Sequence, residues 1–437
     1  MCIRDSIRTR HTSAHPNHAH NLIFMVADGM SHGTLTLADL AIRKTTGQRC
    51  AWMRLWDRPG VRRALQDTAS ADSIVTDSAA AASAWGIGER TNNGAVNFTP
   101  DNREPEPFLV TAKAHGKATA LVTTTTVTHA TPAGFIANVP DRGMEREIAE
   151  QIQQRGVDIV LGGGLKFFPQ TTLELRDAHL VKDRHALAAA PPGLARPLLG
   201  LFAESHVGYV VERPENQPTL EDMTRAALDR LQTSDAGFVL QIEGGRVDHA
   251  AHDNDAAAML AEQLEFDRTI QLLADWSADR DDTLVIVTTD HGNANPGITV
   301  YGRDGERGLD RLMAGRTAFE TMLAAAREEG GGPDMLDRLC LQVAQHRGIE
   351  FGAREKQILT MALNGTPIDP FAPQNNSTSL LGSLLANHYG VAFLSPNHTS
   401  DHVECTAFGP GSQDMPPYLL NTDLHGMVLR ALDMVPH

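Results

Sequence analysis

The chain has 437 residues, of which 41% are hydrophobic and 21% are charged, so it is neither wholly disordered nor a disulfide-stapled miniprotein. Lys and Arg number 38 against 54 Asp and Glu, a formal net charge of -16, which argues against a nucleic-acid-binding module and against binding to anionic membranes. No apolar run approaches the roughly 18 residues of a membrane-spanning helix. The four cysteines form no closely spaced pair, which excludes a CxxC redox or zinc-ribbon site but leaves one long-range disulfide open.

The first twenty residues contain no apolar segment like that of a secretory signal peptide. Their start, MCIRDS, resembles a translated sequencing adaptor. We therefore expect residues 1–20 to be a disordered tail with an artefactual beginning. The lack of a signal peptide then says nothing about the compartment in which the protein acts.

Folded sequence is expected to begin at Asn21, and from there the chain alternates between apolar runs and helical patterns. The apolar runs are rich in Val, Ile and Leu, which is typical of central strands in a parallel sheet covered on both faces. They cover residues 21–30, 117–133, 157–164, 237–245 and 282–293. Helical patterns include residues 219–232 and about 248–276. This alternation predicts an α/β fold, a three-layer sandwich with a central, mostly parallel β-sheet flanked by helices.

Residues 296–393 have a different pattern, with helical stretches, loops rich in Gly, Pro and Asn, and no strong strand. We expect an α/β core over residues 21–295, a mainly helical insertion or cap over 296–393, and a return to the core over 394–437. Breaks within the insertion favour a lid beside a site at the edge of the sheet. A dimerisation element or a purely stabilising element is an equally open alternative.

Polar residues collect where the predicted strands end. They are Asp28, Thr131, Glu243, Asp290 and His291. In open α/β sheets, ligands bind outside the carboxyl ends of the strands. One or two of these residues could be helix caps, but five at strand exits indicate a shared site.

Two Asp–His pairs have the spacing of metal ligands. Asp248 and His252 are four residues apart, so a helix places both on one face, in reach of one cation. Asp290 and His291 are adjacent at a strand exit, where a tight turn lets both reach another. His398 is a further candidate, with His402 as its competitor. The alternatives are a solvated acidic helix start and a capping Asp beside a surface His.

Ser78 and Arg142 are candidates for phosphate chemistry. Ser78 precedes a run of alanines, so we expect it at or near a helix N-terminus, where unpaired N–H groups attract anions. A simple N-cap is the alternative. Arg142 offers a bidentate fork that suits phosphate.

The candidate ligands divide into two kinds of site. The two Asp–His pairs with Asp28 and His398 suit two zinc ions about 4 Å apart, the arrangement used for in-line phosphoryl transfer. Glu243, Thr131 and a shared Asp28 offer oxygen ligands, which suit Mg²⁺.

Six motifs together resemble the alkaline phosphatase family. They are DGM (28–30), VTDSAAAASAW (75–85), HATPA (129–133), EGGRVDHAAH (243–252), TDHGN (289–293) and NHTSD (397–401). They occur in the order found in that family, and the resemblance spans about residues 21–297 and 394–411. It implies an alkaline phosphatase that hydrolyses phosphate monoesters through a phosphoserine intermediate, with two zinc ions and one magnesium ion.

The resemblance also implies a role for each matching residue. One zinc ion would be held by Asp248, His252 and His398, and the other, next to the nucleophile Ser78, by Asp28, Asp290 and His291. Magnesium would be held by Asp28, Thr131 and Glu243. Arg142 would bind the phosphate, and Asp77 would orient Arg142.

Two positions depart from the best-known bacterial pattern. His129 stands where that pattern has Asp, and His249 stands where it has Lys; both match the animal-like variant of the family. We expect both imidazoles to lie beside the third site, which leaves the identity of the third metal open.

The expected substrates are small phosphate monoesters, acted on outside the cytoplasm by a periplasmic or secreted protein, with a homodimer possible. One alternative is a phosphodiesterase or sulfatase of the same metal-hydrolase superfamily. An alternative of another class is a non-catalytic phosphate- or metal-binding protein.

Overall fold

The computed structural model describes residues 18–168, 178–328, 334–368 and 375–435. Its centre is a ten-stranded sheet of order β14-β2-β13-β8-β1-β7-β3-β4-β6-β5. The strands are β1 (Asn21–Val26), β2 (Arg62–Gln66), β3 (Ala118–Thr126), β4 (Ile159–Gly163), β5 (His179–Val181), β6 (Leu198–Leu201), β7 (Phe238–Glu243), β8 (Thr283–Thr288), β13 (Val403–Phe408) and β14 (Tyr418–Leu419). Only β13 runs antiparallel to its neighbours, β2 and β8. The predicted mostly parallel sheet is therefore confirmed.

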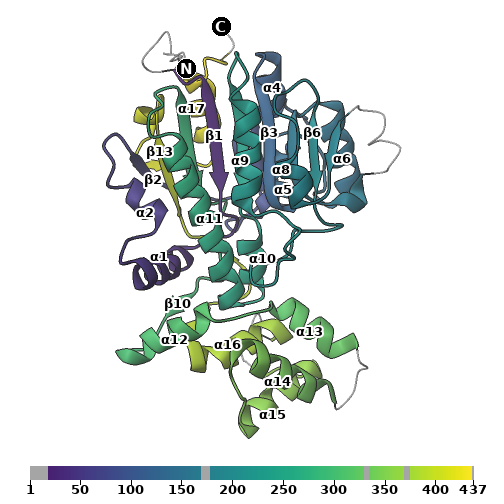
Figure 1. The fold of residues 1–437 in the computed structure, drawn as a ribbon, viewed down its shortest axis with the longest axis vertical. Helices are drawn as coiled ribbons and strands as arrows, with labels where there is room; N and C mark the ends of the chain where they lie inside the picture. Colours follow the sequence, from purple (N-terminus) through teal and green to yellow (C-terminus); the bar gives the residue numbers. More distant parts are fainter. Residues whose placement is uncertain (1–17, 169–177, 329–333, 369–374, 436–437) are drawn as a thin grey trace, which may run out of the picture.

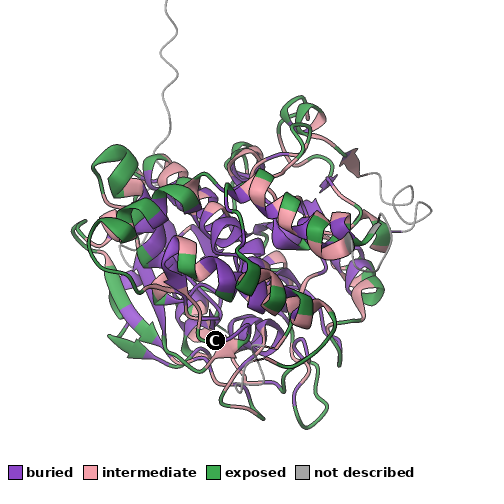
Figure 2. Ribbon diagram, turned by 90° about the horizontal axis from the view of Figure 1, so that it is seen from below, coloured by how far each residue is buried: buried purple, intermediate pink, exposed green. Residues whose placement is uncertain are grey.

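Helices cover both faces of this sheet (Figure 1). On one face lie α1 (His32–Thr46), α2 (Ala51–Leu55), α8 (Arg184–Ala188), α9 (Leu220–Leu231), α10 (Arg246–His252) and α11 (Ala256–Trp276); on the other lie α3 (Ser78–Ile87), α4 (Phe108–Ala114), α5 (Ala130–Gly134), α6 (Glu145–Gln154) and α17 (Asp423–Ala431). Successive residues of β1 alternate between the two cores: Ile23 and Met25 pack on the first side, and Leu22 and Phe24 pack on the second. Figure 2 shows buried residues gathered in the interior and exposed ones on the outer surfaces of the helices. This arrangement is the predicted three-layer sandwich.

The described residues of the segment 296–393 form five helices, which lie beyond the lower end of the sandwich in Figure 1. They are α12 (Arg303–Met313), α13 (Phe319–Glu328), α14 (Asp334–Arg347), α15 (Ala353–Leu363) and α16 (Ser377–Tyr389). The short strands β10 (Gly297–Ile298) and β11 (Val391–Ala392) pair where the segment leaves and rejoins the sandwich. Buried Phe319 and Met322 belong to the same apolar cluster as Met259 of α11. These helices therefore share a core with the sandwich.

One predicted helix is interrupted. The stretch expected to be helical over about 248–276 is two helices, α10 and α11, separated by Asp253, Asn254 and Asp255. Asn254 has a φ of 53°, which lies in the left-handed region and ends the first helix. Asp255 begins the second, because its carboxylate accepts hydrogen bonds from Ala257 N and Ala258 N. The break directly follows His252.

The predicted tail, residues 1–20, lies outside the described residues except for its last three, of which Ala19 is buried. Cys50, Cys340 and Cys405 are free, and Cys2 lies outside the described residues. No helix in the described part of the chain has the length and apolar character to cross a membrane.

Helix α3 is buried on every side, from Ser78 to Ile87. Its small residues let it approach α5 closely. A Cβ added to Gly86 would lie 1.9 Å from Gly134 O, and one added to Gly134 would lie 2.5 Å from the Cβ of Ala82. The alanine run therefore serves a tight helix crossing as well as helix formation.

We expect Gly86→Ala to lower the free energy of unfolding by about 1–3 kcal/mol, because the added methyl group overpacks this crossing. Urea denaturation measures the effect. Gly297→Ala is the control, since a Cβ at Gly297 would meet nothing within 4 Å. Equal stability of the two variants would contradict the tight crossing.

Candidate metal centre

The candidate site lies at the carboxyl ends of adjacent strands in the middle of the sheet. Strands β8, β1, β7 and β3 are neighbours in that order. Asp290 follows β8, Asp28 follows β1, Glu243 ends β7, and Thr131 lies in α5, after β3. Parallel pairing therefore brings together residues that are far apart in the sequence.

The first group is Asp248, His252 and His398, whose ligand atoms all lie within 4.8 Å of one another. His252 Nε2 lies 3.4 Å from Asp248 Oδ2, and His398 Nε2 lies 3.5 Å from Asp248 Oδ1. The other nitrogen of each ring donates to a backbone carbonyl: His252 Nδ1 to Pro396 O at 2.6 Å, and His398 Nδ1 to Thr76 O at 2.8 Å. These bonds hold both Nε2 atoms toward Asp248, where they lie 2.9 Å from each other, as two ligands of one cation would.

The second group is Asp28, Asp290 and His291, all fully buried. His291 Nε2 lies 3.1 Å from Asp290 Oδ2, 3.8 Å from Asp28 Oδ1 and 3.2 Å from Ser78 Oγ. The His291 ring stacks on the His398 ring, with centroids 3.6 Å apart. The first and second groups are therefore in direct contact.

A two-residue ladder also joins these groups. Strand β9 (Gly292–Asn293) pairs with β12 (His398–Thr399). Asn293 Nδ2 donates to Asp248 Oδ1 at 2.7 Å and to Asp248 O at 3.2 Å. Asn293 thus orients a carboxylate of the first group from the loop that carries the second, a role that the sequence analysis missed.

The third group is Asp28, His129 and Glu243. His129 Nδ1 lies 3.6 Å from Glu243 Oε1 and 3.9 Å from Asp28 Oδ2. Thr131 Oγ1 donates to Asp28 Oδ2 at 3.4 Å. All three residues predicted for the magnesium site thus meet here, joined by His129.

Ser78 is the first residue of α3, and the N-cap is Asp77. Asp77 Oδ1 accepts from Ala80 N at 3.0 Å, and its Oδ2 accepts from Arg142 Nη1 at 3.0 Å. The alternative that Ser78 is merely a helix cap is therefore wrong. Arg142 Nη2 also donates to His129 Nε2 at 3.0 Å, so the guanidinium links the Ser78 helix to the third group.

Two further histidine rings lie beside His129 of the third group. The His249 ring centroid is 5.6 Å from that of His129 and 4.5 Å from that of His206. Burial lowers the pKa of His249 and lowers that of His206 to about 3, so both rings are neutral. His206 was not among the predicted site residues, although it too follows a strand exit, that of β6.

The buried charges of the centre fit cations. Asp28, Glu243, Asp248 and Asp290 are all nearly or fully buried. Among the described residues, Asp28 Oδ1, Glu243 Oε1, Asp290 Oδ2 and His129 Nδ1 have no hydrogen-bond partner. Burial, and then Asp290, raise the pKa of Asp28 well above its usual range. A cluster of buried carboxylates with open lone pairs is what metal ions stabilise.

At the first and second groups, imidazoles lower the pKa values of carboxyl groups that burial alone would raise. Although burial opposes it, His252 and His398 lower the pKa of Asp248 well below its usual range, and His291 lowers the pKa of Asp290. Likewise, despite burial, Asp248 raises the pKa of His252 to about 9. These pairs hold the charged forms that metal ions need in Asp248 and Asp290 and a displaceable proton on His252.

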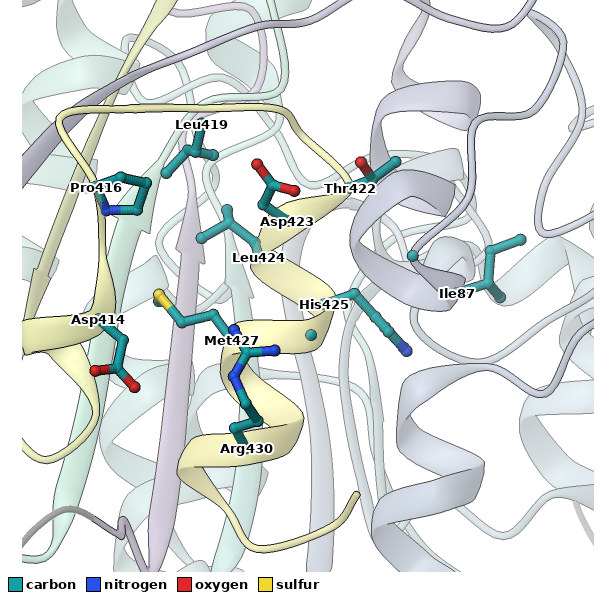
Figure 3. A pocket seen from close by; sticks show the side chains of 12 residues that line it. Ile87, Asp414, Pro416, Leu419, Thr422, Asp423, Leu424, His425, Met427 and Arg430 are labelled. Atoms are coloured by element: carbon teal, nitrogen blue, oxygen red, sulfur yellow. The ribbon is translucent and has the colours of Figure 1, made fainter. Parts of the chain in front are cut away.

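A pocket of about 460 Å³ lies between α17 and the C-terminal end of α3 (Figure 3). Gly88, His425 and Arg430 are part of its lining. Ser78 lies at the opposite end of α3, and none of the predicted site residues lines this pocket. The clustered ligand groups, and not this pocket, therefore define the candidate site.

A family model described as Alkaline phosphatase matches residues 19–434. The chain belongs to the alkaline phosphatase family. It is 28% identical over 431 residues to alkaline phosphatase 4 of Bacillus subtilis, covering 94% of this chain and 88% of that protein. It is 36% identical over 339 residues to streptomycin-6-phosphate phosphatase of Streptomyces griseus, covering 64% of this chain and 75% of that protein.

The fold comparison agrees. The crystal structure of Thermus thermophilus alkaline phosphatase superposes with a TM-score of 0.88 at 31% identity, covering 96% of this chain and 93% of that one. The chain is therefore a phosphoric monoester hydrolase of the alkaline phosphatase family.

We expect zinc binding to the metal-free protein to release protons. The pKa of His252 is about 9 against an ordinary value of 6.5, so at pH 7.5 an ion at this group displaces close to one proton. Affinity for zinc should rise with pH up to about 9. Titration calorimetry in buffers of different ionisation enthalpy measures the released protons.

The same pKa shift fixes the sign of a stability change. Protonated His252 stabilises the metal-free fold fully below about pH 6.5, and this contribution is lost as the pH rises through about 9. Replacement of the exposed His402 by Gln should leave both the proton release and the pH dependence unchanged. Proton release that persists in His252→Gln would contradict this assignment.

Proposed function

We propose that the chain hydrolyses phosphate monoesters through a phosphoserine intermediate on Ser78, with zinc ions at the first two groups and magnesium at the third. The observation that carries the proposal is the position of Ser78. Its Oγ lies 3.2 Å from His291 Nε2, and it begins a helix whose N-terminus favours negative charge.

The metal ions would supply Lewis-acid stabilisation of the attacking and leaving oxygens. Ser78 Oγ gives up its proton to solvent water and attacks phosphorus, and the helix N-terminus stabilises the negative charge on the deprotonated oxygen. Arg142 binds two phosphate oxygens with its guanidinium fork while Asp77 holds that fork in place. In an in-line displacement the ester oxygen would leave on the side away from Ser78 Oγ, toward Asp248, His252 and His398, and take a proton from water. Water then releases phosphate from Ser78.

The ligand set supports a different metal at the third group. Asp28, Glu243 and Thr131 offer oxygen atoms, which suit Mg²⁺. Thr123 and Thr125 both donate to Glu243 Oε2, which leaves Oε1 for the ion. His129 Nδ1 adds a nitrogen ligand when the ring proton is on Nε2, a tautomer that gives up the hydrogen bond from Arg142, so zinc can compete at this group.

The alternatives make different demands on the site. A diesterase or sulfatase has no need for a cation that binds the extra charged oxygens of a monoester, and Arg142 is such a cation. A non-catalytic binding protein needs no nucleophile at a helix N-terminus beside three ligand groups. The homodimer, the periplasmic or secreted location and the domain boundaries 21–295, 296–393 and 394–437 stay predictions.

We expect Ser78→Ala to fold and to bind metal but to lose several orders of magnitude in kcat, because it removes the hydroxyl that lies at a helix N-terminus beside His291 Nε2. Acid quenching during turnover of a labelled monoester should trap phosphoprotein in the wild type and none in the variant. Ser83→Ala, in the same helix, is the control. Label on a different residue would overturn the assignment of Ser78.

We expect Arg142→Ala to raise the KM for p-nitrophenyl phosphate by about 10- to 100-fold, since charge-assisted hydrogen bonds contribute about 1.5–3 kcal/mol. Turnover of bis-p-nitrophenyl phosphate, which carries one charge fewer, should change little. Steady-state kinetics on both substrates measure the difference. A wild type that prefers the diester would favour the diesterase alternative.

A further inference from the structure

The turn between α10 and α11, which directly follows His252, is enclosed by helices of residues 303–389. We call these helices, α12 to α16, the helical insertion. Asn254 has a left-handed backbone, and its carbonyl faces α16 so closely that a Cβ on Gly382 would lie 2.7 Å from Asn254 O. Thr378, also in α16, hydrogen-bonds to the Asp253 carboxylate. The turn that follows His252 is thus in contact with α16 of the insertion.

Asp255 joins this turn to the insertion through a buried ion pair and a backbone hydrogen bond. Its carboxylate accepts from Arg347 Nη2 at 2.9 and 2.8 Å and from Phe319 N at 2.9 Å. The side chains of Arg347 and Asp255 are 0% and 2% exposed. Arg347 Nη2 also donates to Thr317 O at 2.8 Å. One guanidinium therefore joins α14, the start of α13 and the N-cap of α11.

The segment that follows the insertion also contacts His252. The chain leaves β11 at Ala392, and Pro396 O accepts the bond from His252 Nδ1 at 2.6 Å. The segment after the insertion therefore binds the His252 ring directly. The turn that follows His252 is bound to the insertion through Asp255. Because outer contacts of this kind orient metal ligands, the docking of the insertion bears on the metal site.

We propose that Arg347 is a positioning residue for the first ligand group. By pairing with Asp255 it holds the insertion against the α10–α11 turn, and that turn fixes His252 in the position of a zinc ligand. The inference rests on the proposed zinc site, and it gives the insertion a role in metal retention rather than in access to the site.

The test compares two buried ion pairs in the full-length, metal-loaded protein. Arg347→Met removes the clamp and keeps an apolar stem. Arg213→Met is the matched control, because Arg213 pairs with Glu265 at 2.5 and 2.8 Å, and their side chains are 6% and 2% exposed. Glu265 lies in α11, well beyond the turn. Both variants lose a buried ion pair, but only the pair of Arg347 with Asp255 includes a residue of the turn that follows His252.

Zinc retention is measured by competition with a chelator, together with thermal unfolding, kcat and KM. We expect Arg347→Met to lose affinity for one zinc ion per chain by about 10- to 100-fold. Its kcat should fall at limiting zinc, recover in excess zinc and leave KM unchanged. Arg347→Lys should restore part of the affinity. Arg213→Met should unfold at a lower temperature with its zinc affinity intact.

Zinc affinity in Arg347→Met within about two-fold of the wild type would overturn the inference. If the wild type binds no zinc that depends on His252, the proposed function fails instead. Should Arg347→Met not fold, Gly382→Ala displaces the same turn from α16, at Asn254, without stranding a charge. Gly305→Ala is its control, because a Cβ there meets nothing nearer than 3.4 Å. Unchanged zinc affinity in Gly382→Ala would also overturn the inference.

Discussion

Four buried carboxylates at the carboxyl ends of the central strands are the constraint on which the rest of this structure depends. Isolated charges of this kind are costly to bury, and here burial, and then the neighbouring Asp290, raise the pKa of Asp28 well above its usual range. Imidazoles compensate two of them, but Asp28 and Glu243 keep open oxygen atoms. The overall charge of -16 therefore does not conflict with phosphate binding, since bound cations set the local field.

The sequence could predict the sandwich and the residues that converge, because both follow from strong local signals. Runs of apolar and β-branched residues predicted β1, β3, β7 and β8. Polar residues after these runs predicted the position of the carboxyl ends of the strands. Parallel pairing then dictates that those ends meet at one edge. The family resemblance supplied what local signals could not, namely that His398 and not His402 joins Asp248 and His252.

Features set by tertiary contacts escaped prediction. The break at Asn254 lies inside a good helical pattern, and the insertion packs against it. Asn293 and His206 are ordinary polar residues in sequence, and only their neighbours show that one orients Asp248 and the other packs on His249. The insertion was read as a possible lid, yet a lid that swings away as a body has to break the buried pair of Arg347 with Asp255.

The position of β13 has a consequence for biosynthesis. This strand, residues 403–408, lies between β2 and β8 inside the sheet, and His398 lies in the short ladder just before it. A ribosome releases residues in order from the N-terminus, so the sheet stays open along β8 until residues 403–408 have emerged, long after the strands β1 to β8. The first ligand group is therefore completed late in synthesis, when the other strands that carry the centre have already emerged.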